Sequence, residues 1–414
     1  MNPAPDSPSP QTPAQWAVRW HAVVLVALLL AAVPAVHVVW HGLLGRDEPL
    51  LLTRSQVPPP TATSASVLDG SWMLAKEKQL REDSPITWWL RGSWNELKYR
   101  AGVPQSPLVH FGKDEWFFIQ ESVFPDRAAW DRATPQRRQF LRDVKAMVEK
   151  AGAELFMAIV PDKATVYPDR CYADGQLPAC KAGNYAAMLA ELGELGIPTA
   201  DLAAAMAQAR SEMAAARAAD PQGDPAKYDL YFARDTHWRP QGALAGGRAM
   251  ALALEARFGS KLAPRVPMEL GALTEIRLLG DLSANLGLAT IEVPDVQMER
   301  RTVPLSLLSE RLAEVRGYYG VNLRTPNGAV TMDGNDPAAE VLVIGTSFSE
   351  ENGRSALSLF LGRPVRSVIV RGAAGMKPLR AALDELQKGT RAKVVVWEMV
   401  ERGQFEPVWL APKL

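Results

Sequence analysis

The 414-residue chain carries 46 basic and 46 acidic side chains, so its formal net charge is zero. This balance removes the basic surface expected of a nucleic-acid-binding protein, and we therefore exclude nucleic acid as a partner. Hydrophobic residues make up 47% of the chain and charged residues 22%, which is typical of a folded globular protein. The length favours one large domain with appendages.

The N-terminal part departs from this average composition. No charged side chain occurs from Trp20 to Gly45, and this stretch is long enough to span a bilayer, which needs about 20 apolar residues. A cleaved signal peptide is the alternative, but its apolar region would be shorter. We predict a cytoplasmic tail, a transmembrane signal anchor, a linker rich in Pro, Ser and Thr, and a folded domain. These four segments cover residues 1–19, 20–45, 46–66 and 67–414.

The chain contains two cysteines, Cys171 and Cys180, which lie nine positions apart in what reads as a polar loop. We expect a disulfide there, because a zinc site would need more ligands and the chain after the anchor contains only two histidines, His110 and His237. No metal is expected. A disulfide implies an oxidising compartment, which would place the C-terminal part outside the cytoplasm.

Helical and hydrophobic patterns alternate along the folded part. The helical patterns cover residues 131–150, 184–195 and 202–219. The hydrophobic runs cover residues 154–161, 340–345, 365–370 and 392–398. Continuous runs of this kind are typical of a parallel sheet covered on both faces, so we predict an α/β fold with three layers. The Pro-rich region over residues 262–335 interrupts the alternation and reads as an insertion with short strands, to which we assign no role.

Ser347 follows one of the predicted strands almost directly. The strand ends at Gly345, and the chain continues as Thr346, Ser347 and Phe348. In open parallel sheets, ligands bind at the carboxyl ends of the strands. A serine on a tight turn that opens a helix lies where backbone N–H groups can stabilise an oxyanion. The alternative is that Ser347 only caps the following helix, because serine is a preferred N-cap residue.

A carboxylate and an imidazole lie two positions apart at Asp235 and His237, on a predicted loop. Acyl transfer through a serine needs a base that takes the hydroxyl proton and a carboxylate that orients this base. Asp235 and His237 could supply both groups to Ser347. The alternative for such a pair is a surface or capping role, but few histidines are available in the folded part to act as the base.

Five short sequence motifs occur in order along the folded part of the chain. They are FGKDEWFF at residues 111–118, VPDKATVYP at 160–168, DTHWRPQGA at 235–243, GTSFS at 345–349 and VVVWEMVER at 394–402. In this order they resemble motifs of the alginate O-acetylation proteins of the AlgJ/AlgX type, which are circularly permuted relatives of the SGNH hydrolases. The resemblance covers roughly residues 67–405.

This resemblance implies an SGNH hydrolase-like sandwich and an O-acetyltransferase that forms an acetyl-serine on Ser347, with His237 as base and Asp235 as the orienting carboxylate. It also implies an exopolysaccharide acceptor such as alginate, and a membrane-bound O-acyltransferase that supplies the acetyl groups. No cofactor is expected, because no acetyl-CoA site is evident in the sequence. The expected location is the inner membrane, with a single span and the catalytic domain in the periplasm.

Two departures from the family pattern affect these expectations. Glu115 stands where the entry motif usually has Gly. The last strand ends in Trp397-Glu398 and provides no counterpart of the oxyanion Asn of ordinary SGNH enzymes, so the expected oxyanion donors are the N–H groups of Ser347 and Gly372. The chain also ends soon after the last motif, which makes it more similar to the J type than to the X type.

Two other functions remain open from the sequence. A polysaccharide acetylesterase would use the same three residues with water as the acceptor. A non-catalytic polysaccharide-binding subunit of an export complex would need none of them, although Asp235, His237 and Ser347 are all present.

Overall fold

The computed structural model describes most of the chain from residue 85 onward. The described residues are 63, 66, 71, 72, 74, 85–103, 106–287, 290–293, 301–304, 307–325, 328–332, 336–369, 376–405 and 409. The chain divides into two units, Met1–Trp94 and Asn95–Leu414, and the sheet and site below belong to the second. The predicted tail and anchor lie outside the described residues, as does the predicted linker apart from Thr63 and Ser66. Of the helices in the described part, none is both long and apolar enough to cross a membrane.

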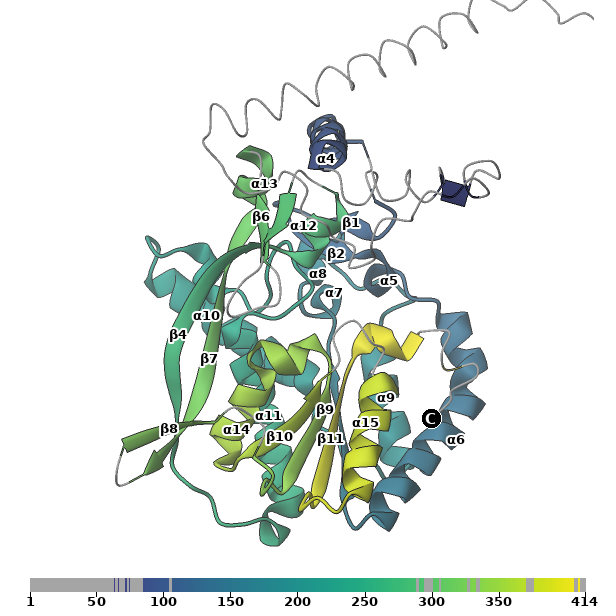
Figure 1. Ribbon diagram of the computed structural model, residues 1–414, viewed down its shortest axis with the longest axis vertical. Helices are drawn as coiled ribbons and strands as arrows, with labels where there is room; N and C mark the ends of the chain where they lie inside the picture. Colours follow the sequence, from purple (N-terminus) through teal and green to yellow (C-terminus); the bar gives the residue numbers. More distant parts are fainter. Residues whose placement is uncertain are drawn as a thin grey trace, which may run out of the picture. The chain divides into compact units, whose positions relative to one another are not determined.

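A sheet of four parallel strands, in the order β10-β9-β11-β3, forms the centre of the second unit (Figure 1). The strands are β3 (Glu154–Val160), β9 (Val341–Gly345), β10 (Val365–Ile369) and β11 (Val394–Val400). Every residue of β9 and β11 is buried, which explains their continuous hydrophobic sequences. The prediction of a parallel sheet is confirmed.

Helices cover both faces of this sheet (Figure 1). One face is covered by α6 (Arg127–Lys150), α9 (Asn184–Glu194) and α15 (Met376–Gln387), and the other by α10 (Leu202–Ala219), α11 (Pro240–Phe258) and α14 (Arg354–Leu361). Successive strand residues point to opposite faces, so Trp397 packs in the first of these cores and Val396 in the second. The predicted three layers are therefore present.

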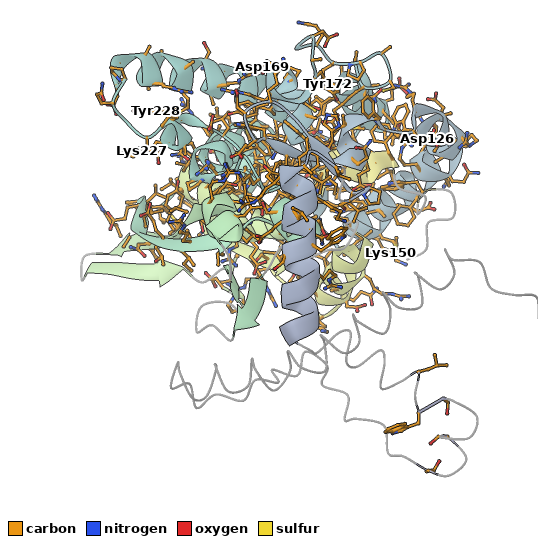
Figure 2. The ribbon with its side chains drawn as sticks, turned by 90° about the horizontal axis from the view of Figure 1, so that it is seen from above. Asp126, Lys150, Asp169, Tyr172, Lys227 and Tyr228 are labelled. Atoms are coloured by element: carbon orange, nitrogen blue, oxygen red, sulfur yellow. The ribbon has the colours of Figure 1, made fainter. Side chains whose placement is uncertain are left out.

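Helix α6 begins earlier than its hydrophobic pattern suggests. The side chain of Asp126 caps the helix by accepting a hydrogen bond from the amide of Ala129 at 2.9 Å. The helix then runs through Pro135 to Lys150, and Figure 2 labels Asp126 and Lys150 at its two ends. The predicted start at Asp131 is four residues late, because the first turn carries little of the apolar stripe.

The region predicted to be an insertion forms a three-stranded antiparallel sheet in the order β4-β7-β8. Its elements are β4 (Met268–Leu279), α12 (Asp281–Asn285), β5 (Thr290–Val293), β6 (Arg301–Pro304), α13 (Leu307–Leu312), β7 (Ala313–Thr325) and β8 (Gly328–Met332). The expectation of short strands is wrong for β4 and β7, which have 12 and 13 residues. Much of β4 is exposed, so its sequence lacks the continuous apolar run by which the central strands were found.

Further elements precede α9 in the described part of the chain. They are α4 (Pro85–Arg100), β1 (Val109–Phe111), β2 (Phe117–Ile119), α5 (Gln120–Val123), α7 (Lys163–Val166) and α8 (Pro168–Cys171). Strands β1 and β2 form an antiparallel pair in which His110 lies opposite Phe118. His110 contacts the carbonyl of Cys171 at 3.3 Å, and we assign it no part in the chemistry.

The two cysteines are both free in the structure, so the expected disulfide is not formed. Cys171 ends α8 and packs in the apolar core on the α10 and α11 side, where it is 4% exposed. Cys180 is partly exposed in the turn before α9, and its carbonyl accepts a hydrogen bond from Asn184 at 2.7 Å. Burial raises the pKa of the Cys171 thiol to about 12. The argument for an oxidising compartment therefore loses its support.

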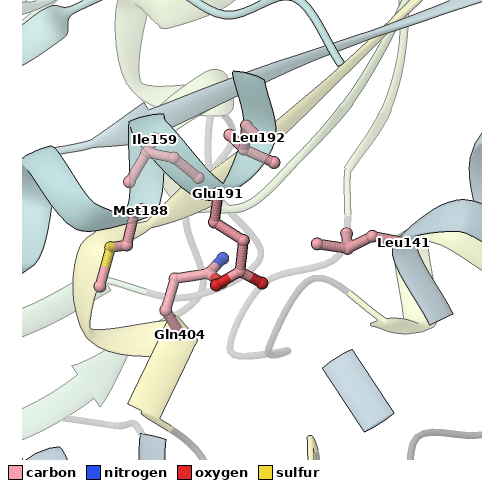
Figure 3. Close-up of a pocket in the computed structure, with 6 residues that line it drawn as sticks. All are labelled: Leu141, Ile159, Met188, Glu191, Leu192 and Gln404. Carbon is pink, nitrogen blue, oxygen red and sulfur yellow. The ribbon is translucent and has the colours of Figure 1, made fainter. Parts of the chain in front are cut away.

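A small cavity lies between α6, β3 and α9 (Figure 3). It is lined by Leu141, Ile159, Met188, Glu191, Leu192 and Gln404. The Glu191 carboxylate on its wall forms a buried ion pair with Arg137, with N–O distances of 3.1 and 2.7 Å. The cavity has room for about one water molecule, so it cannot hold a sugar and is not the functional site.

Candidate active site

Ser347 lies at the carboxyl edge of the sheet, two residues after β9 ends at Gly345. A π-helical turn, η4 (Ser349–Gly353), follows and leads into α14. The turn is tight, because a Cβ atom at Gly345 would collide with the side chain of Ser349. Glycine is therefore required at this position, and the chain reverses so closely that the partly exposed Ser347 stands at the strand end.

His237 and Asp235 lie on the loop before α11. The loop is closed by an isolated bridge between Tyr231 and Trp238 and by a hydrogen bond from the Phe232 amide to the His237 carbonyl at 3.1 Å. Within this loop the Asp235 carboxylate accepts from the backbone amide of His237 at 2.9 Å. The spacing of two residues thus folds the carboxylate back onto its own histidine.

The structure brings the three predicted residues into one hydrogen-bonded chain. His237 Nε2 is 2.6 Å from Ser347 Oγ, and His237 Nδ1 is 2.6 Å from Asp235 Oδ1. With its proton on Nδ1, the neutral imidazole donates to Asp235 and accepts from the serine hydroxyl. This is the arrangement in which a histidine can remove a serine proton while a carboxylate stabilises the imidazolium that forms.

The second oxygen of the Asp235 carboxylate, Oδ2, also accepts hydrogen bonds. Oδ2 accepts from the Arg316 guanidinium and from the backbone amide of Asp281, the latter at 2.5 Å. Asp235 is only 1% exposed. Burial alone would raise the pKa of Asp235, but Arg316 and His237 outweigh this effect and hold the pKa well below its usual range. Asp235 is therefore an anion at neutral pH.

Lys163 fixes the backbone of the same loop. Its buried ammonium donates to the carbonyls of Phe232, Ala233 and Asp235 at 2.9, 3.0 and 2.8 Å. Burial lowers the pKa of Lys163 to about 8, although neighbouring carboxylates, Glu314 first, oppose this shift. Lys163 opens α7 directly after β3, so it ties the loop to the central sheet.

The Glu398 carboxylate holds the turn after β9 through hydrogen bonds. It is 1% exposed near the end of β11, and its Oε2 accepts from the amides of Thr346 and Ser349 at 2.8 and 3.2 Å. The hydroxyls of the same two residues also donate to the carboxylate, at 3.0 and 2.9 Å. Glu398 thus holds Thr346 and Ser349, the residues on either side of Ser347 and Phe348. The Ser347 amide is not one of the groups that donate to Glu398. Burial raises the pKa of Glu398, and these hydrogen bonds only partly offset the rise.

Aromatic packing restricts the imidazole. The ring of Phe348 lies 4.8 Å from that of His237, measured between centroids. The indole N–H of Trp238 donates to the Phe348 carbonyl at 3.1 Å. The serine turn and the histidine loop therefore contact each other through Phe348 and Trp238 as well as through Ser347 and His237.

The remaining expectations concern the oxyanion donors and the metal. Gly372 lies outside the described residues, so its role stays a prediction. The side chains of Asp235, His237 and Asp281 offer oxygen and nitrogen atoms within 4.8 Å of one another. However, both Asp235 oxygens already accept hydrogen bonds, and the Arg316 cation occupies the position beside Oδ2. This donor set fits an oriented histidine better than a metal ion.

Sequence reasoning thus found the three residues of the hydrogen-bonded chain, but it missed the residues that hold them. Lys163 and Glu398 lie within quoted motifs, so their motifs were a signal, although no role was assigned to them. Arg316 and Asp281 lie in or beside the inserted sheet, and nothing in their sequence context points to the site. Glu115 forms an ion pair with Arg234 at 2.7 Å and does not belong to the hydrogen-bonded series of Ser347, His237 and Asp235.

The chain is similar to known proteins over most of its length. Residues 109–401 match the family described as SGNH hydrolase-like domain, acetyltransferase AlgX. A probable alginate O-acetylase AlgJ of Pseudomonas syringae pv. tomato is 27% identical over 373 residues, which cover 85% of this chain and 85% of that protein. The protein of the same description from Pseudomonas putida is 26% identical over 369 residues, covering 84% and 85%.

A solved structure supports the same fold. The O-acetyltransferase domain of Pseudomonas putida AlgJ superimposes with a TM-score of 0.54 at 23% sequence identity. The match covers 74% of this chain and 98% of that domain. The similarity therefore extends over nearly the whole of the other domain.

Proposed function

Because the chain belongs to the family of SGNH hydrolase-like acetyltransferase domains typified by AlgX, we propose that it transfers acetyl groups to hydroxyls of an alginate-type polysaccharide through Ser347. The observation that carries this proposal is the hydrogen-bonded chain from Ser347 Oγ through His237 to Asp235, with both distances at 2.6 Å. The choice of acceptor is supported by the relatives described as probable alginate O-acetylases.

In the first step, Ser347 Oγ attacks the carbonyl carbon of an acetyl ester. His237 Nε2 takes the hydroxyl proton, and Asp235 stabilises the imidazolium by accepting from Nδ1. The tetrahedral intermediate then collapses, the alcohol of the donor leaves with the proton from His237, and acetyl-serine remains. The negative oxygen of the intermediate needs N–H donors, and the Ser347 amide is our candidate because Glu398 does not accept from it.

In the second step, a sugar hydroxyl gives its proton to His237 Nε2 and attacks the acetyl carbonyl. The bond to Ser347 Oγ breaks, and the serine recovers its proton from His237. The acetyl group has then moved from one oxygen to another without oxidation or reduction. The residues suffice for this sequence without a cofactor.

We also propose the location and partner that the sequence predicts. The uncharged segment over residues 20–45 would hold the domain over residues 67–414 at the inner membrane, on the periplasmic side. Acetyl-CoA is confined to the cytoplasm, so a membrane-bound O-acyltransferase would deliver the acetyl groups. With both cysteines free, this location rests on the anchor sequence and the acceptor chemistry.

The test uses the purified full chain with p-nitrophenyl acetate as donor and an oligomer of mannuronate as acceptor. Mass spectrometry of the oligomer measures transfer, and free acetate measures hydrolysis. We expect Ser347→Ala to abolish transfer. The control is Ser358→Ala, which removes a serine hydroxyl outside the site, one that is buried and donates to the Arg363 carbonyl at 2.8 Å.

The two rival functions give different results in this assay. Release of acetate by the wild-type chain without acetylation of the oligomer would identify an acetylesterase. A wild-type chain that binds the oligomer but turns over no donor would identify a binding subunit. Full transfer by the Ser347→Ala variant would refute the serine mechanism.

A further inference from the structure

The inserted sheet is connected to the histidine loop through one face of β7. Glu314 accepts from the amides of Ala233 and Arg234 at 3.0 and 2.7 Å, and from the Arg239 guanidinium at 2.8 Å. Glu314 is 8% exposed, whereas the next residue, Val315, is 47% exposed. This alternation is the period of a strand, so the residue two positions after Glu314 lies on the same face of β7.

Arg316 is the next residue on the same face. Its guanidinium is 7% exposed and forms an ion pair with Oδ2 of Asp235, the oxygen that does not face His237. The guanidinium also lies over the ring of Phe232, 5.3 Å from its centroid. Arg316 is therefore packed against the loop as well as paired with the carboxylate.

The same strand is also hydrogen-bonded to η4, the π-helical turn that follows Ser347. Asn352, in η4, is 4% exposed and has a φ of 70°, a left-handed conformation that is uncommon outside glycine. Its amide donates to the Gly317 carbonyl at 2.9 Å, and its side-chain oxygen accepts from the Tyr319 amide at 2.9 Å. Asn352 thus satisfies two backbone groups of β7 from a constrained backbone position.

We propose that β7 is a clamp that sets the distance between the two halves of the active site, with Arg316 as the positioning residue for Asp235. The clamp comprises Glu314, Arg316 and the backbone of residues 317–319, which bind the histidine loop on one side and η4 on the other. This proposal rests on the proposed function, because it assigns residues that serve the serine chemistry.

The physical need for such a residue lies in the torsion of the aspartate. Rotation about χ2 of an aspartate is soft, and within the loop the His237 amide holds Oδ1 at 2.9 Å, so the orientation of the carboxylate plane also depends on what holds Oδ2. Arg316 and the Asp281 amide hold Oδ2, which leaves Oδ1 directed at His237. Without the guanidinium, the buried anion would lose its ion pair, and Oδ2 would be held by the Asp281 amide, so the carboxylate would be oriented less tightly.

The experiment measures the reactivity of Ser347 directly. A fluorophosphonate probe forms a covalent bond with an activated serine and releases fluoride, so its rate reports activation without any acetyl donor or sugar. We would compare Arg316→Met and Arg316→Lys with Arg324→Met in the full chain. Arg324 is a matched control, since it lies on the same strand and pairs with Glu269 at 2.5 Å while remaining 68% exposed.

The expected labelling rate falls about 100-fold in Arg316→Met, the scale of a small misplacement of reacting groups. Arg316→Lys should recover part of the rate, because it keeps a cation beside Oδ2. Guanidinium added at millimolar concentration should speed labelling of Arg316→Met and leave the control unchanged. Transfer assays should show the loss in kcat, with little change in KM.

Several outcomes would overturn the clamp. One is a labelling rate equal to that of the wild type in both Arg316 variants. Another is a labelling rate that falls by the same factor in Arg316→Met and Arg324→Met. If Arg316→Met fails to fold by circular dichroism, Arg316→Lys decides, and a folded Lys variant that labels no faster than a Ser347→Ala background would also overturn it. A wild-type chain that labels rapidly but transfers no acetyl would refute the proposed function and leave the clamp standing.

Discussion

Replacement of Glu398 tests how the nucleophile turn is supported. Its carboxylate accepts from two buried amides and two hydroxyls of Thr346 and Ser349. In Glu398→Met the Thr346 amide loses its acceptor, whereas the Ser349 amide still donates to the Thr346 carbonyl at 3.1 Å. One buried amide left unsatisfied costs about 1–3 kcal/mol and each of the two lost hydroxyl hydrogen bonds about 1 kcal/mol, so the fold should be destabilised by about 3–5 kcal/mol. Glu398→Gln keeps an oxygen at the position of Oε2, which accepts from both amides, and should cost only about 1 kcal/mol.

Urea unfolding followed by circular dichroism measures both variants, and the fluorophosphonate rate measures the serine. The Gln variant should fold and label within about tenfold of wild type, because the turn keeps its main acceptor. The Met variant should be far less stable, since the loss is a large part of the 5–15 kcal/mol typical of a whole domain. Equal free energies of unfolding for the two variants would refute the view that Glu398 acts as a hydrogen-bond acceptor.

Four further predictions follow from the same geometry. Asp235→Asn should lower transfer by about 10⁴-fold, as in the best-studied serine triad, and a silent substitution would show that another group orients His237. Because the pKa of Lys163 is lowered from 10.5 to about 8 in the folded chain, the unfolded state binds more protons between these values, so stability should rise with pH across this window by up to about 3 kcal/mol. Melting temperatures of wild type and Lys163→Met check this, and parallel curves would contradict it. Alkylation of the non-reduced, denatured chain should modify both Cys171 and Cys180, with Cys180 reacting first in the native state because Cys171 is buried; an unmodified pair would restore the disulfide. The full chain should fractionate with the inner membrane, and a form cut before Val67 should not; a soluble full chain would exclude the anchor.

The parts of the fold that could be predicted are those recorded in local sequence. Strands inside a sheet covered on both faces have continuous hydrophobic sequences, so the ends of β3, β9, β10 and β11 were predicted to within two residues. Strands β4 and β7 pack on one face only, and their mixed sequences hid their length. The disulfide was wrong for a related reason, because nine residues of separation does not reveal that Cys171 faces an apolar core.

The site divides in the same way. Asp235 and His237 are two residues apart, so a loop can bring them together and the sequence shows them as a pair. The contacts that fix them join residues far apart in the chain, 81 positions between Asp235 and Arg316 and 52 between Thr346 and Glu398. A single sequence contains no signal for such contacts, because topology alone decides which distant strands meet.

The two buried carboxylates of the site show why position in the fold must be combined with charge. Asp235 is paired with a guanidinium, and its pKa is lowered; Glu398 receives hydrogen bonds from neutral donors only among its described partners, and its pKa is raised. A negative charge is therefore stabilised at Asp235, where the imidazolium forms during transfer, and is disfavoured at Glu398, where the requirement is an acceptor for amides. Replacement by the neutral amide should consequently be severe at Asp235 and mild at Glu398, although both side chains are equally buried. The ratio of the two transfer rates, measured in one assay, would contradict this reasoning if it were close to one.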